Sequence, residues 1–269
     1  MNRIDATFNR LKKERKKALI TYIAAGDPDM ETTVKLAVTL EEAGADIIEL
    51  GIPFSDPLAD GPTIQRASQR ALESGCTVKK VIAMVKKLRK KVRVPIVFMT
   101  YYNLILNHGV ERFVKDAVGC GADGLIVPDL PIEESAPLEK AADRSGFNII
   151  QLTAPTTSIS RIRDISRRSK GFIYYVSVTG VTGARKDLPP KMRSAVRLIS
   201  KTASLPVCAG FGVSTSSQAR KVAGMADGVI VGSAIIRIIE KNLGAKRKMV
   251  REVGKFAGSL AEAVHGERL

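Results

Sequence analysis

The sequence predicts a single-domain (β/α)8 TIM barrel that covers residues 1–269 and carries an extra N-terminal helix. Short β-branched apolar runs recur eight times along the chain, and segments with helical spacing of apolar residues lie between them. No Pro/Ser-rich linker interrupts this series. The length would also allow two domains, but α/β barrels of roughly 200–250 residues commonly form one domain.

The eight expected strands are mostly continuous apolar runs, which are typical of parallel strands covered on both faces. In chain order they are Ala18–Ala25, Asp46–Leu50, Pro95–Thr100, Gly124–Pro128, Asn148–Leu152, Phe172–Val176, Pro206–Ala209 and Gly228–Val231. Eight parallel strands favour a closed barrel, because closure leaves no exposed sheet edge. A doubly wound open sheet remains the alternative, since periodicity alone does not establish closure.

Apolar residues three and four positions apart predict the helices between these strands. Examples are Thr33, Leu36, Ala37 and Leu40, then Val78, Val81, Ile82 and Val85, then Val196, Ile199 and Ala203. Several of these segments end near a glycine suited to a left-handed helix cap, at Gly44, Gly121 and Gly146.

The composition is that of an ordinary globular chain, with 45% hydrophobic and 26% charged residues. Cys76, Cys120 and Cys208 lack the paired spacing of a zinc site or redox motif, so we expect reduced, buried thiols in a cytoplasmic protein. Residues 1–17 form a basic amphipathic segment without a signal-peptide apolar stretch, and no run of about 18 apolar residues occurs. Secretion and membrane spanning are therefore not expected.

The formal net charge of +16 raises the question of a nucleic-acid partner. Basic residues cluster in two runs, within 12–17 and 86–93, and both are expected at the ends of surface helices. No RNA-binding signature, helix-turn-helix pattern or zinc finger accompanies them. We expect solvated faces or attraction of an anionic substrate; a nucleic-acid-binding or noncatalytic scaffold protein is the alternative from a different class.

An ionisable residue, Glu49, lies at the carboxyl end of an otherwise apolar strand. Barrel active sites occupy that end, and alternation places Glu49 on the same face as Ile47 and opposite Ile48. If that face is the barrel interior, partial desolvation raises the pKa of Glu49 and keeps a proton available. A solvent-facing glutamate at a strand end is the alternative.

A loop rich in proline and glycine follows this strand over residues 51–62 and contains Asp60. Asp60 is either a second functional carboxylate or the first residue of an Asp-Gly-Pro turn. Glycines also follow the last three expected strands, at Gly180 and Gly183, Gly210 and Gly212, and Gly232 beside Ser233. Each pair alone is typical of a turn, but together they predict a phosphate site, because barrels often bind phosphate at these loops and a helix N-terminus.

The run from Glu49 to Gln65, ELGIPFSDPLADGPTIQ, resembles the signature of tryptophan synthase α chains. The resemblance extends over essentially the whole chain. Supporting segments are Tyr22 with Ala25-Gly26-Asp27-Pro28, Met99 with Tyr101 and Asn103, Pro128-Asp129-Leu130-Pro131, Tyr174 with Val181-Thr182-Gly183, Gly210-Phe211-Gly212, and Gly232-Ser233-Ala234-Ile235. It implies a lyase that cleaves indole-3-glycerol phosphate to indole and glyceraldehyde 3-phosphate in tryptophan biosynthesis.

The resemblance also assigns residues and partners. It makes Glu49 and Asp60 the catalytic pair, and it assigns substrate binding to Tyr101, Tyr174, Gly183, Phe211, Gly212, Gly232 and Ser233. It implies no cofactor in this chain, and a β subunit that carries pyridoxal phosphate in an α2β2 heterotetramer. Pro53, Asp56, Pro57 and Asn103 are expected near that partner.

The implied reaction is a reverse aldol cleavage, for which Glu49 is the candidate proton-transfer group and Asp60 the acceptor for the indole N–H. No metal is required, and His108 and His265 lie in no ligand-like cluster. The nearest rival enzymes are indole-3-glycerol-phosphate synthase and a phosphoribosyl isomerase. The synthase would be expected to use a strand-end lysine, and no expected strand ends in one.

Overall fold

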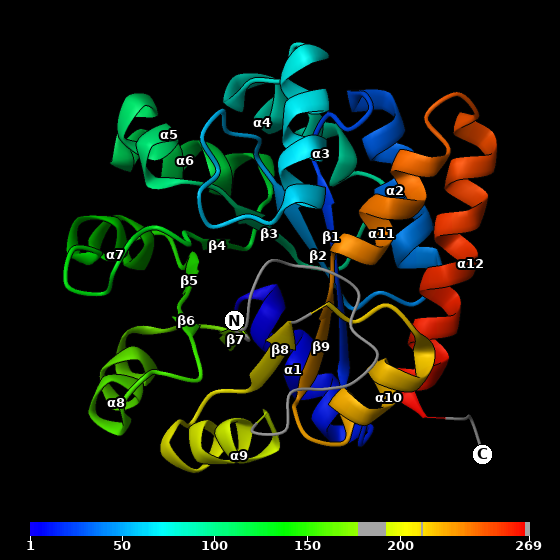
Figure 1. Ribbon diagram of the computed structural model, residues 1–269. Helices are drawn as coiled ribbons and strands as arrows, with labels where there is room; N and C mark the ends of the chain where they lie inside the picture. The colour runs from blue at the N-terminus through cyan, green and yellow to red at the C-terminus, as the bar shows by residue number, and fades with distance from the viewer. Residues whose placement is uncertain (177–191, 211, 267–269) are drawn as a thin grey trace.

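Parallel strands and helices alternate along the chain in the computed structural model, which describes residues 1–176, 192–210 and 212–266 (Figure 1). The strands are β1 (Ala18–Ala24), β2 (Ile47–Gly51), β3 (Ile96–Met99), β4 (Gly124–Ile126), β5 (Asn148–Ile150), β6 (Leu152–Thr153), β7 (Ile173–Val176), β8 (Val207–Gly210) and β9 (Gly228–Val231). They lie where the eight apolar runs predict them, but the fifth run is divided into β5 and β6.

The strands form a ring that closes at this division. Their order is β5-β4-β3-β2-β1-β9-β8-β7-β6, and only Gln151 separates β5 from β6. The N–H of Lys170 donates to the carbonyl of Ile149 (2.9 Å), and the N–H of Tyr174 donates to the carbonyl of Gln151 (3.1 Å). The fifth run thus pairs with β4 at its start and with β7 at its end. This closure confirms the barrel and excludes the open sheet.

Helices cover the outside of the ring in Figure 1. The helices on the outside are α2 (Met30–Glu42), α3 (Pro62–Glu73), α4 (Val78–Leu88), α5 (Tyr102–His108), α6 (Val110–Cys120), α7 (Ala136–Asp143), α8 (Ile159–Arg168), α9 (Met192–Thr202), α10 (Ser216–Ala223), α11 (Ser233–Lys241) and α12 (Lys246–His265), whereas α1 (Arg3–Lys13) lies at one end of the ring. The predicted cap glycines Gly44, Gly121 and Gly146 have φ values of 99°, 96° and 63°, a left-handed region open to glycine at little steric cost.

Alternation along each strand separates two hydrophobic layers. On β2, Ile48 and Leu50 pack outward against the helices, whereas Ile47 belongs to a second cluster inside the barrel. The residues of that inner cluster contributed by the strands or their flanks are Ala18, Ile20, Ile47, Val97, Ile126, Ile150, Phe172, Cys208 and Ile230. The inner layer fills the amino-terminal part of the barrel and leaves its carboxyl end for a site.

The extra helix α1 completes this inner layer. Its buried residues Ile4, Phe8 and Leu11 pack with the inward-facing side chains, and the rings of Phe8 and Phe172 lie 5.8 Å apart. Two ion pairs join α1 to the residues that precede β4 and β2: Arg3 pairs with Asp123 (2.7 Å), and Arg10 pairs with Asp46 (2.9 Å). The predicted N-terminal helix therefore covers the amino-terminal end of the barrel.

The two basic runs lie at helix ends, as predicted, at the end of α1 and the end of α4. Arg89 is an exception to the expected solvated face, because its side chain is only 14% exposed and binds Asp123 (3.0 Å) and the carbonyl of Val94 (2.8 Å). Among the described residues, no helix is both long and apolar enough to cross a membrane.

We predict that Ile4→Ala destabilises the fold by about 2–5 kcal/mol, because it removes a fully buried side chain from a packed layer. Urea unfolding followed by circular dichroism measures this change. The control is Leu58→Ala, whose side chain is 92% exposed and whose effect should stay below about 0.5 kcal/mol. Equal effects of the two substitutions would contradict the role of α1 as part of the core.

Candidate active site

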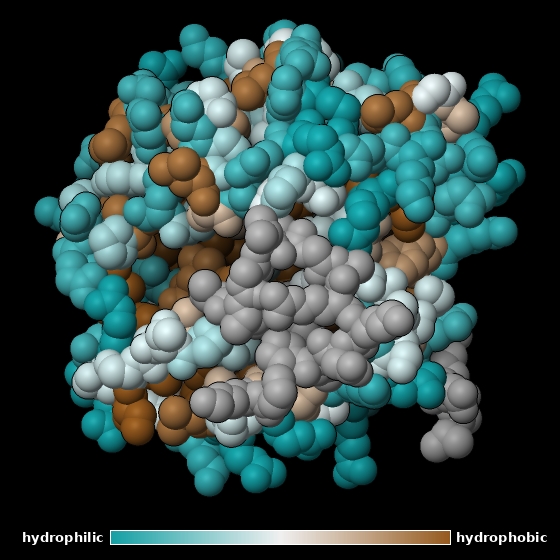
Figure 2. All heavy atoms as spheres, viewed as in Figure 1, coloured by the Kyte–Doolittle hydropathy of each residue, from teal (hydrophilic) through white to brown (hydrophobic). Residues whose placement is uncertain are grey.

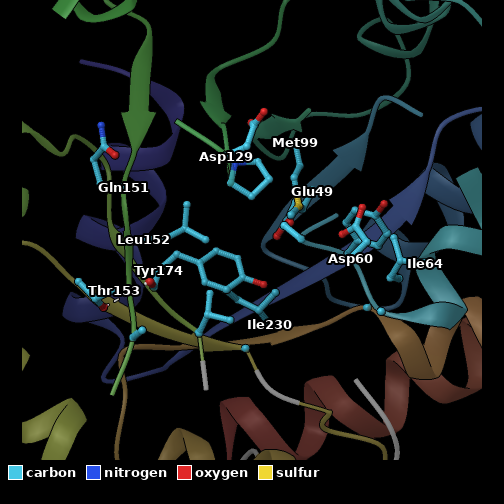
Figure 3. Close-up of a pocket in the computed structure, with 18 of the residues that line it drawn as sticks. Glu49, Asp60, Ile64, Met99, Asp129, Gln151, Leu152, Thr153, Tyr174 and Ile230 are labelled. Carbon is cyan, nitrogen blue, oxygen red and sulfur yellow. Dashed lines mark hydrogen bonds between the residues drawn. The ribbon is translucent and has the colours of Figure 1, made fainter. Parts of the chain in front are cut away.

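A cavity of about 640 Å³ opens at the carboxyl end of the strands. Figure 2 shows hydrophobic side chains gathered in a hollow on this face, surrounded by hydrophilic ones. Six of the predicted site residues line the cavity, namely Glu49, Asp60, Tyr174, Gly212, Gly232 and Ser233. In Figure 3, Glu49 and Asp60 lie on one side of Tyr174, and Gln151 and Thr153 on the other. Gly183 and Phe211 lie outside the described residues.

Glu49 faces the barrel interior. It stands in register with Tyr22 on β1 and Val97 on β3, and it is only 1% exposed. Neither of its carboxylate oxygens has a hydrogen-bond partner among the described residues. Burial, and then the negative charge of Asp60, raises the pKa of Glu49 to about 8, so the group is mostly protonated at pH 7. The predicted interior position is confirmed.

Asp60 lies at the end of the loop between β2 and α3, and its backbone is held on both sides. Its N–H donates to the carbonyl of Pro57 (3.0 Å), and its own carbonyl accepts from the side chain of Gln65 (2.9 Å). Gly61 occupies the N-cap of α3 without a side-chain cap bond. The Asp60 carboxylate is thus not engaged in capping this helix and remains available to the cavity.

The carboxyl groups of Glu49 and Asp60 have different pKa values. Burial raises the pKa of Asp60 to about 6, and a hydrogen-bonding interaction with the hydroxyl of Tyr101 opposes that rise. At pH 7 Asp60 is therefore mostly ionised while Glu49 is mostly protonated. One group can donate a proton at the same pH at which the other can stabilise positive charge.

Tyr101 contacts the loop between β2 and α3 and does not line the cavity. It is absent from the residues that line the cavity, and its hydroxyl accepts a hydrogen bond from the N–H of Ala59 (3.0 Å). Its ring lies 5.2 Å from that of Phe54. The structure thus places this predicted substrate-binding residue where it holds the loop that carries Asp60.

Two tyrosines cross the barrel interior beside the carboxylates. A Cβ atom at Gly51 would collide with the hydroxyl of Tyr22, and one at Gly210 would lie 2.7 Å from the hydroxyl of Tyr174. Glycine at these positions is therefore required by the close approach of the phenol groups. Burial and the neighbouring carboxylates raise the pKa values of both tyrosines well above 10, so both phenols stay neutral.

One end of the cavity, at the start of α11, suits an anion. Helix α11 begins at Ser233, directly after Gly232, and no described side chain caps its first turn. The free N–H groups and the helix dipole of such a terminus attract negative charge. Gly212, with a φ of 48°, also lines this end and brings bare backbone to the cavity.

Three further lining residues, Asp129, Gln151 and Arg161, were not predicted as site residues. Asp129 accepts hydrogen bonds from the N–H of Tyr102 (3.0 and 3.2 Å) at the start of α5. Gln151 sits at the bend between β5 and β6, and Arg161 pairs with Glu133 through two bonds (2.6 and 3.0 Å). Gln151 could have been found by the signal that identified Glu49, a polar residue within an apolar run, whereas nothing in a basic helix distinguishes Arg161.

The histidines and cysteines lie away from the cavity lining and have structural contacts. His108 contacts Asp116 (2.8 Å) and His265 contacts Asp46 (2.7 Å), while the three cysteines are free and buried. Within residues 1–176, 192–210 and 212–266, no group of three or more His, Cys, Asp or Glu side chains could hold a metal ion.

We predict that Glu49→Gln stabilises the protein increasingly as the pH rises. Between about 4.5 and about 8 the folded state keeps a proton on Glu49 that the unfolded chain has lost, so the free energy of unfolding falls with pH. The amide in the variant cannot ionise, so the free energy of unfolding of the variant does not fall for this reason. From about pH 5 to pH 9 the difference between variant and wild type should grow by a few kcal/mol, since one pKa unit is worth about 1.4 kcal/mol. Urea titrations at each pH measure it, and a constant difference would contradict a raised pKa.

Comparison with known proteins agrees with this geometry. The family model for the tryptophan synthase alpha chain matches residues 8–265. The tryptophan synthase alpha chain of Geotalea daltonii is 55% identical over 244 residues, 91% of this chain and 92% of that one. Its counterpart from Geobacter sulfurreducens is 51% identical over 264 residues, 98% of this chain and 99% of its own.

Solved structures give the same result. The tryptophan synthase subunit alpha of Legionella pneumophila superposes with a TM-score of 0.91, at 41% identity, with 98% of each chain covered. A tryptophan synthase structure from Mycobacterium tuberculosis also gives 0.91, at 35% identity, and covers 98% of this chain and 99% of that one. This chain belongs to the tryptophan synthase α-chain family, whose members cleave indole-3-glycerol phosphate to indole and glyceraldehyde 3-phosphate in tryptophan biosynthesis.

Proposed function

We propose that Glu49 and Asp60 catalyse this cleavage, with Glu49 as the proton-transfer group. One observation carries the proposal: two carboxyl groups line the same cavity, one ionised and the other protonated, with no hydrogen-bond partner among the described residues for the protonated one. The mouth position of both residues is where barrel enzymes place their chemistry.

In the proposed reaction, Glu49 first gives its proton to the indole carbon that bears the glycerol chain. The ring then carries a positive charge, and Glu49 is a carboxylate. This carboxylate removes the proton from the adjacent hydroxyl, the carbon–carbon bond breaks, and its electron pair returns to the ring. The products are indole and the aldehyde of glyceraldehyde 3-phosphate, and Glu49 is protonated again.

Asp60 supports the same step without exchanging a proton with carbon. As a carboxylate it accepts a hydrogen bond from the indole N–H and stabilises the positive charge that develops on the protonated ring. Its partial burial strengthens this effect, because less water screens the charge than at an exposed position. The hold of Tyr101 on Ala59 and Asp60 keeps the carboxylate in place.

For the substrate's phosphate we propose the end of the cavity formed by Gly212, Gly232 and Ser233, with Tyr174 beside the indole. The uncapped start of α11 supports this assignment. Gly183 and Phe211 stay predictions that rest on the resemblance alone. The substrate has an apolar ring and an anionic tail, so a cavity with an apolar wall and one anion site fits both parts.

The α chains of this family form a complex with a β subunit, and pyridoxal phosphate belongs to that subunit, so none is assigned to this chain. We propose an α2β2 assembly that covers the cavity mouth near Pro53, Asp56, Pro57 and Asn103. The exposed apolar side chain of Leu58 lies on the same loop and supports a docking surface there.

We propose that residues 1–269 form one catalytic domain, supported by the ring of strands that the described residues form around the candidate site. We also propose a cytoplasmic location, which fits three buried thiols without disulfides.

Glu49→Gln should lower the turnover of indole-3-glycerol phosphate by about 10²-fold or more, because the amide keeps the shape but cannot transfer a proton. Asp60→Asn should act similarly. Indole release measures both, with substrate binding retained. Asp164→Asn, an exposed carboxylate on α8, is the control and should leave turnover unchanged. Near-normal indole release by Glu49→Gln would refute its assigned role.

Gly212→Ala should weaken binding of inorganic phosphate about tenfold, because a side chain at a positive φ costs about 1–2 kcal/mol and shifts the backbone at the anion site. Free indole should bind as before. Gly232→Ala is a less selective test, since its Cβ would lie 3.2 Å from Tyr22, which also lines the cavity. Gly258→Ala on α12, where a Cβ meets nothing within 4 Å, is the control. Equal weakening of both ligands by Gly212→Ala would indicate general damage instead.

A further inference from the structure

Four charged side chains form a connected network beside the barrel, away from the reacting groups. Arg66 and Arg70 lie on α3, Glu240 lies on α11, and Asp27 lies in the loop after β1. Arg66 binds Glu240 through two bonds (2.6 and 3.0 Å), and Arg70 binds Asp27 through two (2.8 and 2.8 Å). Arg70 also reaches Glu240 (3.2 Å) and joins the two pairs.

The network is partly withdrawn from water at its centre. The side chain of Asp27 is fully buried, that of Arg70 is 18% exposed, and that of Glu240 is 27% exposed. A buried ion pair gains little net stability, because desolvation offsets the attraction. The two arginines instead fix the geometry of the network, because each guanidinium binds a carboxylate through two hydrogen bonds.

The two helices joined by this network each begin at the cavity, because Asp60 and Gly61 before α3 and Gly232 and Ser233 at the start of α11 all line it. Helix α3 starts two residues after Asp60, and Gln65 in its first turns binds the Asp60 carbonyl (2.9 Å). Helix α11 starts at Ser233, at the proposed phosphate end. The helices pack against one another, and they lie side by side in Figure 1. A shift of α3 along α11 would therefore change the separation of Asp60 from the phosphate end.

Asp27 connects α3 to the barrel, and through Arg70 it is linked to Glu240 on α11. The preceding residue, Gly26, donates its N–H to Thr33 (2.9 Å), and its carbonyl accepts from Ser74 at the end of α3 (3.0 Å). The loop that carries Asp27 is thus fastened to β1, α2 and α3 together. A movement of Arg70 relative to the strands would have to break the buried pair with Asp27.

We propose that Asp27, Arg66, Arg70 and Glu240 are positioning residues that set the distance between Asp60 and the phosphate end of the cavity. The inference rests on the proposed function, because it takes Asp60 and the start of α11 as the two ends of one substrate site. The network acts on a ligand that spans both ends. Each end keeps its own contacts, so the network does not change the affinity for a fragment that occupies only one end.

The test compares Arg70→Lys with wild type in the complex with the β subunit. Lysine keeps the charge but cannot hold Asp27 at two points and reach Glu240 as well. We expect kcat/KM for indole-3-glycerol phosphate to fall about tenfold or more, since small displacements of positioned groups are costly to rate. Indole-propanol phosphate should bind about tenfold more weakly, whereas indole and inorganic phosphate, measured separately, should bind within about twofold of wild type.

Arg89→Lys is the matched control. Arg89 also pairs with a buried carboxylate, Asp123, and is similarly withdrawn from water, but it lies at the amino-terminal end of the barrel. Arg89→Lys should lower the midpoint of urea unfolding, as Arg70→Lys does, but it should leave kcat and KM unchanged. Glu240→Gln is a second variant that preserves shape and the Asp27–Arg70 pair, and it should show the same loss for the spanning ligand to a smaller extent.

Unchanged turnover and unchanged binding of indole-propanol phosphate in Arg70→Lys would overturn the inference. So would an equal loss of affinity for indole, phosphate and the spanning ligand, which would indicate general damage. Near-normal turnover by Glu49→Gln and Asp60→Asn would overturn the proposed function instead, so the two failures are distinguishable.

Discussion

The carboxyl group of Glu49 lies inside a closed barrel, with neither oxygen hydrogen-bonded by a described residue, and the chemistry of the site depends on this burial. A carboxylate in such a place would be strongly destabilised, so the group keeps its proton to about pH 8. Asp60, less buried and in contact with Tyr101, ionises about two units lower. The protein thus holds a proton donor beside a negative charge.

The rest of the fold maintains that environment. Helix α1 and the inner hydrophobic layer fill the amino-terminal part of the barrel, so the open space is confined to the carboxyl end. Gly51 and Gly210 leave room for the phenols of Tyr22 and Tyr174, which add bulk without adding charge. These features shield Glu49 from water, and the proposed phosphate groups at the start of α11 line the same cavity.

Much of this arrangement could be predicted from the sequence, because its signals are local. Strand alternation placed Glu49 on the inner face with Ile47, and apolar runs located every strand to within a few residues. The bend at Gln151 was not predicted, since residues 148–152 are together no longer than one strand and only the closure of the ring divides them.

The missed features depend on contacts between distant segments. Arg70 and Glu240 are ordinary charged residues on surface helices until packing brings α3 beside α11, and Arg89 is one of a basic run until it meets Asp123. Tyr101 was predicted to bind substrate because its neighbours resemble the family. Its hydrogen bond with Ala59 could be found only from the position of the loop.

The protonation state of Glu49 at neutral pH tests the account most directly. Infrared difference spectra between wild type and Glu49→Gln, recorded from about pH 6 to pH 9.5, isolate the carboxyl stretch of this one group. The account predicts a protonated carboxyl band at pH 7 that is replaced by carboxylate bands around pH 8. Carboxylate bands already complete at pH 6 would contradict it.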